Sequence, residues 1–264
     1  MQICFDGQFY PADQPVVTAG NRGYRYGEGL FETIRVEIGR IPLASLHFDR
    51  LFNGMSRLGL QPGEGLSREV LSDTILKLCS INKLPRARIR LSVSKTEDQL
   101  HYLIECFPFM PADPEQGISI EICPDVRKHY DQYSDLKSAN YLPYLLAARF
   151  ASQNHVDDAL VLNTEHRIIE STVANIFLVK GDTIVTPSLK EGCISGVMRR
   201  WLMEHFTIIE GSIHEDDLLN ADEILLSNAL HGVKWVRQFM DKFFENRIAK
   251  QIQERINREV WQFS

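Results

Sequence analysis

Short runs in which apolar and polar residues alternate recur along this chain, and they predict β-strands. The first two runs form a predicted hairpin over residues 3–10, with Asp6 and Gly7 at the turn. Residues 30–45 are expected to form two strands joined near Gly39. Further strands are predicted at residues 87–94, 100–107, 118–123, 158–163, 167–171, 174–187 and 221–228.

Apolar residues at helical spacing predict helices between these strands. Residues 43–60 have apolar residues at helical spacing, among them Leu46, Leu51, Met55 and Leu58, and Gly59 is the expected stop. A second amphipathic helix is predicted over residues 66–83. Others are expected just after Lys137, after Ser195-Gly196, and at residues 248–262.

A proline-rich stretch divides the chain. Residues 108–117 read "PFMPADPEQG", with three prolines and a glycine, and are the predicted linker. The expected organisation is a small α+β domain at residues 1–107 and a larger domain at residues 118–264, so the fold class is α/β (α+β).

Composition narrows the class of protein. The 264 residues carry a formal net charge of -6 and no block of basic residues, which argues against a nucleic-acid partner. The apolar runs are too short to span a bilayer, and the first residues show no signal peptide. Five scattered cysteines without a paired spacing favour free thiols in a reducing cytoplasm. The eight histidines lack a metal-ligand spacing, so no catalytic metal is expected.

Lys137 is the first candidate catalytic residue. It stands in "YSDLKSANYLPYLLAARFAS", just before a predicted apolar helix. A lysine at a helix edge often extends its ammonium to water. The alternative is a Schiff-base lysine, whose amine must be neutral to act as a nucleophile.

Two further charged residues give Lys137 a chemical context. Arg50, in "LHFDRLFNGM", is either a surface residue of an amphipathic helix or a two-pronged phosphate ligand. Glu170, in "RIIESTVANIF", follows an apolar strand, where a buried carboxylate requires a partner such as a protonated pyridine nitrogen.

Two loops offer backbone N–H groups to an anion. In residues 186–200, Ser195-Gly196 opens a helix, and helix N-termini suit phosphates. Residues 225–232, "LLSNALHG", follow an apolar strand and form either an anion cradle or a simple turn. Together with Lys137, Glu170 and Arg50, these features match the parts of a pyridoxal 5'-phosphate site.

Six motifs in order carry a family resemblance: "RYGEGLFETIRV", "HFDRL", "DLKSAN", "IESTVANIFLV", "TPSLKEGCISGVMRR" and "ADEILLSNAL". They resemble the class IV aminotransferases, the fold-type IV pyridoxal phosphate enzymes, over nearly the whole chain. This resemblance implies two domains joined by an interdomain loop, a small amino substrate, and a homodimer with active sites near the subunit interface.

The resemblance also implies roles for individual residues. Lys137 matches the Schiff-base lysine, Glu170 the carboxylate facing the pyridine nitrogen, and Arg50 the arginine on the phosphate. The matched phosphate-side positions are Gly196, Val197, Met198 and Asn228. The matched substrate-side positions are Tyr26, Phe31, Thr33 and Arg35 on one strand, with Ala229 and either Arg88 or Arg90. Alternation on a strand equally describes plain core and surface positions.

Details of the motifs bear on the reaction. The corresponding motif of branched-chain aminotransferases typically reads F-E-G-I-R. This chain has "FETIR", so Thr33 stands in the place of a glycine. Thr33 with Arg35, and the short "KSAN" spacing, look most like 4-amino-4-deoxychorismate lyases, in which the hydroxyl could assist proton transfer. The expected arginine with glycines after "SVS" is absent, and Lys95 occupies that region. A branched-chain or D-amino acid transaminase and a non-catalytic binding relative remain alternatives.

Overall fold

The computed structural model describes residues 1–63, 65–97, 99–111, 113 and 115–262. The chain forms two compact units: unit 1 contains residues 1–111 and 137–140, and unit 2 contains residues 112–136 and 141–264. The predicted linker 108–117 includes residues 112 and 114, which lie outside the described residues. The short segment 137–140 contains Lys137 and clusters with unit 1, although it is flanked on both sides by unit 2.

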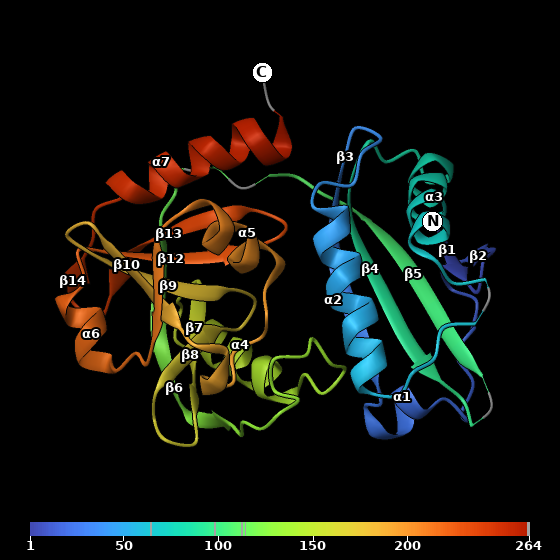
Figure 1. Ribbon diagram of the computed structural model, residues 1–264, viewed down its shortest axis with the longest axis horizontal. Coiled ribbons are helices and arrows are strands. Elements are labelled where there is room, and N and C mark those ends of the chain that lie inside the picture. Colours follow the sequence, from blue (N-terminus) through green and yellow to red (C-terminus); the bar gives the residue numbers. More distant parts are fainter. Residues whose placement is uncertain (64, 98, 112, 114, 263–264) are drawn as a thin grey trace. The chain divides into compact units, whose positions relative to one another are not determined.

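Unit 1 is built on an antiparallel sheet with strand order β2-β1-β5-β4-β3 (Figure 1). Its strands are β1 (Gln2–Phe5), β2 (Gln8–Pro11), β3 (Gly29–Glu37), β4 (Arg86–Lys95) and β5 (Leu100–Pro108). The predicted first hairpin is confirmed, and its turn residues Asp6 and Gly7 both have positive φ angles.

Three helices of unit 1 are α1 (Arg22–Tyr26), α2 (Ala44–Arg57) and α3 (Arg68–Ile81). Helices α2 and α3 begin and end close to their predicted positions and bury their apolar faces. They cover the sheet face that carries Ile34 and Ile89, both fully buried. The other face of the sheet carries Phe31, Thr33 and Arg35.

The expected strand after Gly39 is wrong. Beyond β3, only a single bridge joins Glu37 and Arg40 before α2 begins. Pro42 lacks the N–H that a ladder needs, and Leu43 has a φ of 58°, which is incompatible with an extended strand.

Unit 2 contains a sheet whose strands close into a ring: β9 pairs with β12, then β13, β6, β7 and β8 follow, and β8 returns to β9. Strands β10 and β11 extend the sheet from β9, and β14 pairs with β13. The strands are β6 (Ile118–Lys128), β7 (Asp158–Asn163), β8 (Ile168–Ser171), β9 (Asn175–Lys180), β10 (Thr183–Pro187), β11 (Ile208–Gly211), β12 (Glu223–Asn228), β13 (Gly232–Phe239) and β14 (Lys242–Phe243).

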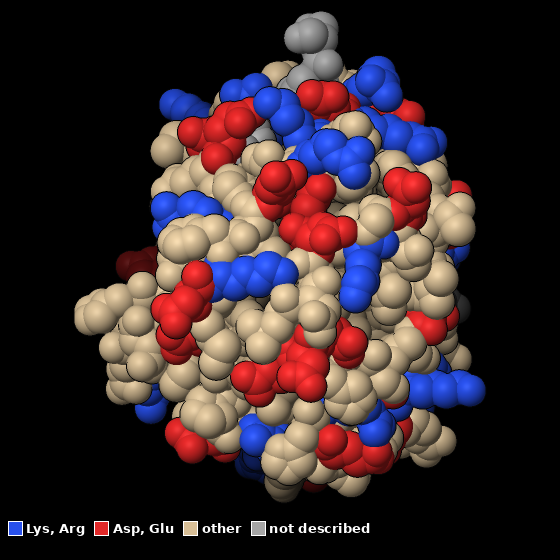
Figure 2. Space-filling model, turned by 90° about the vertical axis from the view of Figure 1, so that its left-hand side faces the viewer, with Lys and Arg blue, Asp and Glu red and all other residues tan. Residues whose placement is uncertain are grey.

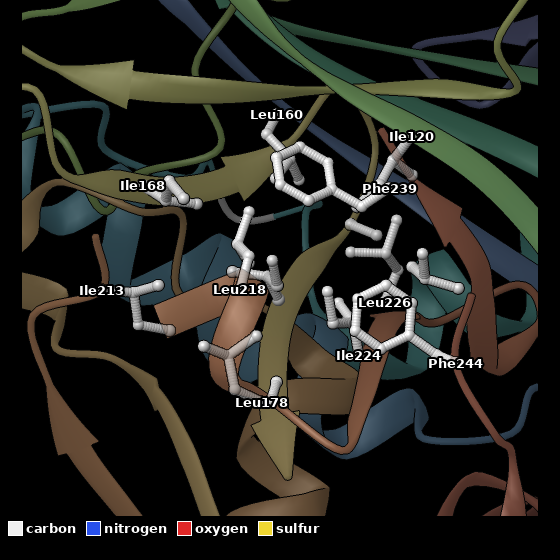
Figure 3. Close-up of a cluster of buried hydrophobic side chains, with 14 of the residues drawn as sticks. Ile120, Leu160, Ile168, Leu178, Ile213, Leu218, Ile224, Leu226, Phe239 and Phe244 are labelled. Carbon is white, nitrogen blue, oxygen red and sulfur yellow. The ribbon is translucent and has the colours of Figure 1, made fainter. Parts of the chain in front are cut away.

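The inward-facing residues of the ring form the main core of unit 2. Figure 3 shows these side chains directed toward one another, including Ile120, Leu160, Ile224, Leu226 and Phe239. Every second residue of a strand points to the same face, so the residues between them point outward. The outward face of β8, β9 and β12 is therefore available to carry polar side chains.

Helices pack around this ring of strands: α4 (Leu142–Gln153), α5 (Val197–His205), α6 (Glu215–Asn220), α7 (Arg247–Ile256), the 3-10 turn η1 (Leu189–Glu191) and the π-helical turn η2 (Asn257–Trp261). Helix α4 packs on β6 and β7. Within the described part of the chain, no helix is long and apolar enough to cross a bilayer. Acidic and basic side chains are interspersed on the face in Figure 2, without an extended basic patch.

Candidate active site

The segment that contains Lys137 is hydrogen-bonded to the start of β3. Phe31 N donates to Lys137 O at 3.0 Å, and Ala139 N donates to Gly29 O at 2.9 Å. The Lys137 ammonium nitrogen lies 4.5 Å from the centroid of the Phe31 ring. Lys137 is therefore held over an aromatic residue of β3 by its own backbone, before α4 begins.

Asn140 closes this segment against a glycine. Gly27 has a φ of 69°, and a Cβ atom there would lie 2.1 Å from Asn140 Oδ1. Any larger residue at position 27 would displace Asn140 and strain the backbone. The glycine of "RYGEGLF" and the asparagine of "KSAN" are thus two parts of one contact.

Arg50 does not stand alone in unit 1. Its guanidinium donates to both oxygens of Glu32, from Nε at 2.7 Å and from Nη2 at 2.5 Å. Glu32 is 1% exposed and also lies 2.7 Å from His47 Nδ1. Burial raises the pKa of Glu32, but Arg50 and His47 outweigh it and bring this pKa to about 2.

His47 is neutral in this network. Burial, the largest influence, lowers the pKa of His47, and the Glu32 carboxylate counteracts it only in part. A neutral imidazole next to a carboxylate carries its proton on Nδ1 and donates it. Glu32 therefore orients the side chains of both His47 and Arg50 on α2. The sequence alone did not single out Glu32, because it occupies one of many positions in an alternating strand.

The predicted substrate-side residues Phe31, Thr33 and Arg35 share the sheet face opposite α2. Thr33 pairs directly with Arg90, whose guanidinium carbon lies 4.1 Å from the Phe31 ring centroid. Phe31 and Arg90 line an open hollow of about 230 Å³ in unit 1, together with Ser92, Ser94 and His101 among others. This face can accommodate a small molecule with an anionic group near Arg90.

Other predicted substrate residues have different surroundings. Arg35 is 2% exposed and donates to Glu37 at 2.6 Å, and Arg88 lies over the Phe107 ring. Lys95 pairs with Glu28 at 3.0 Å. Tyr26 is not on the strand as expected: it is the last residue of α1 and is exposed, because Asn21 caps a helix there and Gly27 ends it.

Glu170 of unit 2 is buried and accepts hydrogen bonds from three donors. Its carboxylate is buried and accepts hydrogen bonds from Tyr144 Oη at 2.6 Å and Lys128 Nζ at 3.1 Å on Oε1. Ile194 N donates to Oε2 at 2.9 Å. A carboxylate has about four acceptor directions, so these three donors leave room for one more on Oε2. Sequence reasoning missed Lys128 and Tyr144, which carry no motif of their own.

A row of polar side chains crosses three strands beside Glu170. In the register of β8, β9 and β12, Glu170 pairs with Asn175, and Asn175 pairs with Ser227. Directly opposed residues share a face, so the three side chains lie on the same outward face. Two strand spacings separate Glu170 from Ser227, about 10 Å. No signal in the sequence pointed to Asn175, whereas Ser227 lies within the predicted anion loop 225–232 without being singled out there.

Gly196 brings the predicted anion-binding helix to this row. Asn175 Nδ2 donates to Ile194 O at 2.8 Å, and a Cβ atom at Gly196 would lie 1.9 Å from Asn175 Oδ1. Gly196 precedes Val197 and Met198, the first residues of α5, whose N–H groups have no acceptor within the helix. Only a glycine allows the helix start to approach the row so closely.

The second predicted anion loop begins at the end of β12. Asn228 Oδ1 accepts hydrogen bonds from Leu230 N and His231 N, so it closes the turn that contains Ala229. The hydroxyl of Ser227 is buried and, among the described residues, has no hydrogen-bond partner. A buried hydroxyl without a partner is costly, and an anion on this row would supply one.

The polar groups of unit 2, Glu170 and the helix start at Gly196, fit the ring nitrogen and the phosphate of pyridoxal phosphate. Glu170 keeps one acceptor direction for a ring N–H, while Ser227 and the α5 N-terminus offer donors to a phosphate. No group of three or more side chains placed to hold a metal ion is found in the ranges that the structure describes.

Comparison with known proteins places the chain in a family. The family model for amino-transferase class IV matches residues 29–239. A Methanocaldococcus jannaschii protein provisionally named a branched-chain-amino-acid aminotransferase is 27% identical over 97% of this chain and 94% of its own. An aminodeoxychorismate lyase of Vibrio harveyi is also 27% identical, over 83% of this chain and 86% of its own.

A solved structure has the same fold. The crystal structure of 4-amino-4-deoxychorismate lyase from Pseudomonas aeruginosa superposes with a TM-score of 0.85 at 26% identity. The alignment covers 99% of this chain and 100% of that one.

Proposed function

The chain belongs to the class IV aminotransferase family and is a pyridoxal phosphate-dependent enzyme, and we propose that it acts as a 4-amino-4-deoxychorismate lyase, releasing pyruvate and leaving 4-aminobenzoate. The observation that carries the cofactor assignment is the row Glu170–Asn175–Ser227 with Gly196 beside it. Such a row suits an elongated ligand with a ring nitrogen at one end and a phosphate at the other.

Each residue of the proposed site has a defined task. Lys137 would hold the aldehyde of the cofactor until the substrate amine takes its place there, and the neutral Lys137 amine released by that exchange would accept the proton from the α-carbon of the substrate. Glu170 Oε2 accepts the hydrogen bond of the protonated ring nitrogen. Arg50, the N–H groups of Val197 and Met198, and the turn at Asn228 bind the phosphate. When bound, pyridoxal phosphate supplies a ring that withdraws electrons from the substrate carbon.

Thr33 favours the lyase. Thr33 occupies the position at which the branched-chain aminotransferase motif has a glycine. Its hydroxyl lies on the same sheet face as Phe31 and Arg90. A hydroxyl there can pass a proton during release of pyruvate, and Arg90 or Arg88 can bind a substrate carboxylate. The likeness to the Pseudomonas aeruginosa lyase at 26% identity supports the same reaction.

A transaminase is the second candidate, acting on a branched-chain L-amino acid or a D-amino acid. The Methanocaldococcus jannaschii relative supports it, because the match covers 97% of this chain. In that reaction the same residues would abstract the α-proton, and a 2-oxo acid would complete the cycle. A non-catalytic binding relative is a remote third candidate, since it gives Lys137 no task.

A homodimer in the cytoplasm is also part of this proposal. Helix α4 exposes Leu142, Leu145 and Leu146 on unit 2, and a second copy of the chain would cover them. The five cysteines are all buried free thiols, which suits a reducing compartment.

A spectrum of the cofactor-loaded protein tests the function. The absorbance is recorded before and after adding L-leucine, D-alanine, L-glutamate or 4-amino-4-deoxychorismate, with pyruvate and 4-aminobenzoate assayed alongside. The lyase predicts an unchanged cofactor with both products released in equal amounts. Conversion of the cofactor to its amine form by an amino acid would make the enzyme a transaminase instead. A protein that never acquires cofactor absorbance would refute both.

A further inference from the structure

The Lys128 ammonium donates hydrogen bonds to three acceptors. It is the last residue of β6, and its ammonium donates to Ser134 O at 2.9 Å, Tyr144 Oη at 2.7 Å and Glu170 Oε1 at 3.1 Å. An ammonium has three N–H bonds, whereas a neutral amine has two. Three oxygen acceptors therefore match the charged form of Lys128, and its side chain is only 13% exposed.

The charges around Glu170 balance without any ligand. The Glu170 side chain is 4% exposed, and Lys128 is the cation that contacts it in the part of the chain the structure describes. Burial, together with the Glu170 carboxylate, raises the pKa of Tyr144 well above its ordinary value, so Tyr144 keeps its proton and donates. Burial likewise raises the pKa of Cys193 to about 12, so this neighbouring thiol adds no charge. One cation and one anion remain.

This arrangement decides where a shared proton rests. When a protonated ring nitrogen meets Glu170 Oε2, the proton can stay on the ring or move to the carboxylate. Lys128 contacts the Glu170 carboxylate directly, whereas a protonated ring at Oε2 would lie farther from Lys128. The attraction between Lys128 and the ionised carboxylate therefore outweighs the repulsion between Lys128 and the positive ring. We propose that Lys128 is a positioning residue that keeps Glu170 ionised and thereby keeps the proton on the ring nitrogen. This inference rests on the proposed cofactor site.

The test in the loaded enzyme uses Lys128→Met, which keeps the length of the side chain and removes its charge. The readout is the ¹⁵N resonance of pyridoxal phosphate labelled at its ring nitrogen, which differs between the protonated and neutral ring. We expect the ratio of protonated to neutral ring to fall about tenfold or more, as one neighbouring charge changes proton affinity by at least that factor. Lys128→Arg should restore the resonance of the parent enzyme.

Lys250→Met is the matched control. Lys250 contacts Glu115 at the same nitrogen–oxygen distance of 3.1 Å, but both side chains are more than half exposed. This variant should leave the ring resonance unchanged. An unchanged resonance in Lys128→Met would overturn the inference while leaving the proposed function intact.

A second measurement needs no cofactor. Melting temperatures are compared for the apoproteins of Lys128→Met, Glu170→Gln and the double variant. Lys128→Met alone should lower the melting temperature by roughly 5–10 °C, because it leaves a buried carboxylate unpaired. Lys128→Met should lower the melting temperature much less when it is made in the Glu170→Gln variant. Equal losses in both backgrounds would contradict charge compensation. If the parent protein binds no pyridoxal phosphate, the proposed function fails and the ring-nitrogen role fails with it.

Discussion

Replacing Glu32 by glutamine should destabilise unit 1 by a pH-dependent amount. Glu32 is 1% exposed and accepts hydrogen bonds from Arg50 and His47, and its pKa is about 2 against an ordinary value of 4.5. The gap between these two values corresponds to about 3 kcal/mol of folding free energy. Glutamine keeps the shape of the side chain and removes the charge.

The sign of the pH dependence follows from the lowered pKa of Glu32. The folded chain binds this proton less readily than the unfolded chain, so the contribution of Glu32 is complete above pH 4.5. It is lost as the pH falls toward 2. The free-energy difference between the parent protein and Glu32→Gln should therefore narrow from about 3 kcal/mol at pH 7 to about 1 kcal/mol at pH 3.

Urea unfolding of the apoprotein, followed by far-ultraviolet circular dichroism, measures this difference. Tryptophan fluorescence is unsuitable, because Trp201, Trp235 and Trp261 all belong to unit 2. Glu28→Gln is the control: Glu28 contacts Arg22 and Lys95 but is 25% exposed, so its loss should cost below about 1 kcal/mol. A difference between the parent protein and Glu32→Gln that is the same at pH 7 and pH 3 would refute the charge-based reasoning.

Three further variants address the proposed site. Lys137→Ala should abolish turnover, measured as product formation, and near-normal activity would reject the mechanism. Arg50→Ala should weaken cofactor retention by roughly 2–3 kcal/mol, because a charge-assisted contact is lost; equilibrium dialysis measures it, and unchanged affinity would exclude a phosphate role. Gly196→Ala should weaken cofactor affinity, since its Cβ would lie 1.9 Å from Asn175 Oδ1. Gly63→Ala, where the space is open, is its control, and equal dialysis affinities for these two variants would contradict the close approach.

Local signals in the sequence were sufficient for most elements of secondary structure. Asp6-Gly7 places a hairpin turn, and the spacing of Leu51 and Met55 predicts α2, because both depend on neighbouring residues. The pattern of apolar and polar residues gave a wrong prediction where the backbone geometry of individual residues prevents strand pairing. The alternation after Gly39 resembles a strand, but Pro42 and the positive φ of Leu43 end the pairing.

For the candidate site too, some features could be predicted from the sequence and others could not. The residue types at Lys137, Arg50 and Glu170 already point to pyridoxal phosphate chemistry, since an amine, a guanidinium and a carboxylate each suit a different group of that cofactor. The sequence contains no sign that Glu32 binds Arg50, because the contact needs α2 to pack on β3. Nor does it indicate that Arg35 is paired with Glu37.

Residue type and spacing along the chain are enough to identify the family, the order of the elements and the chemical character of the site. Which side chains face one another depends on how the strands and helices pack. The row Glu170–Asn175–Ser227 exists because the register of β8, β9 and β12 opposes residues that are up to 52 positions apart. Register depends on how buried faces of whole strands pack, so no local motif encodes it.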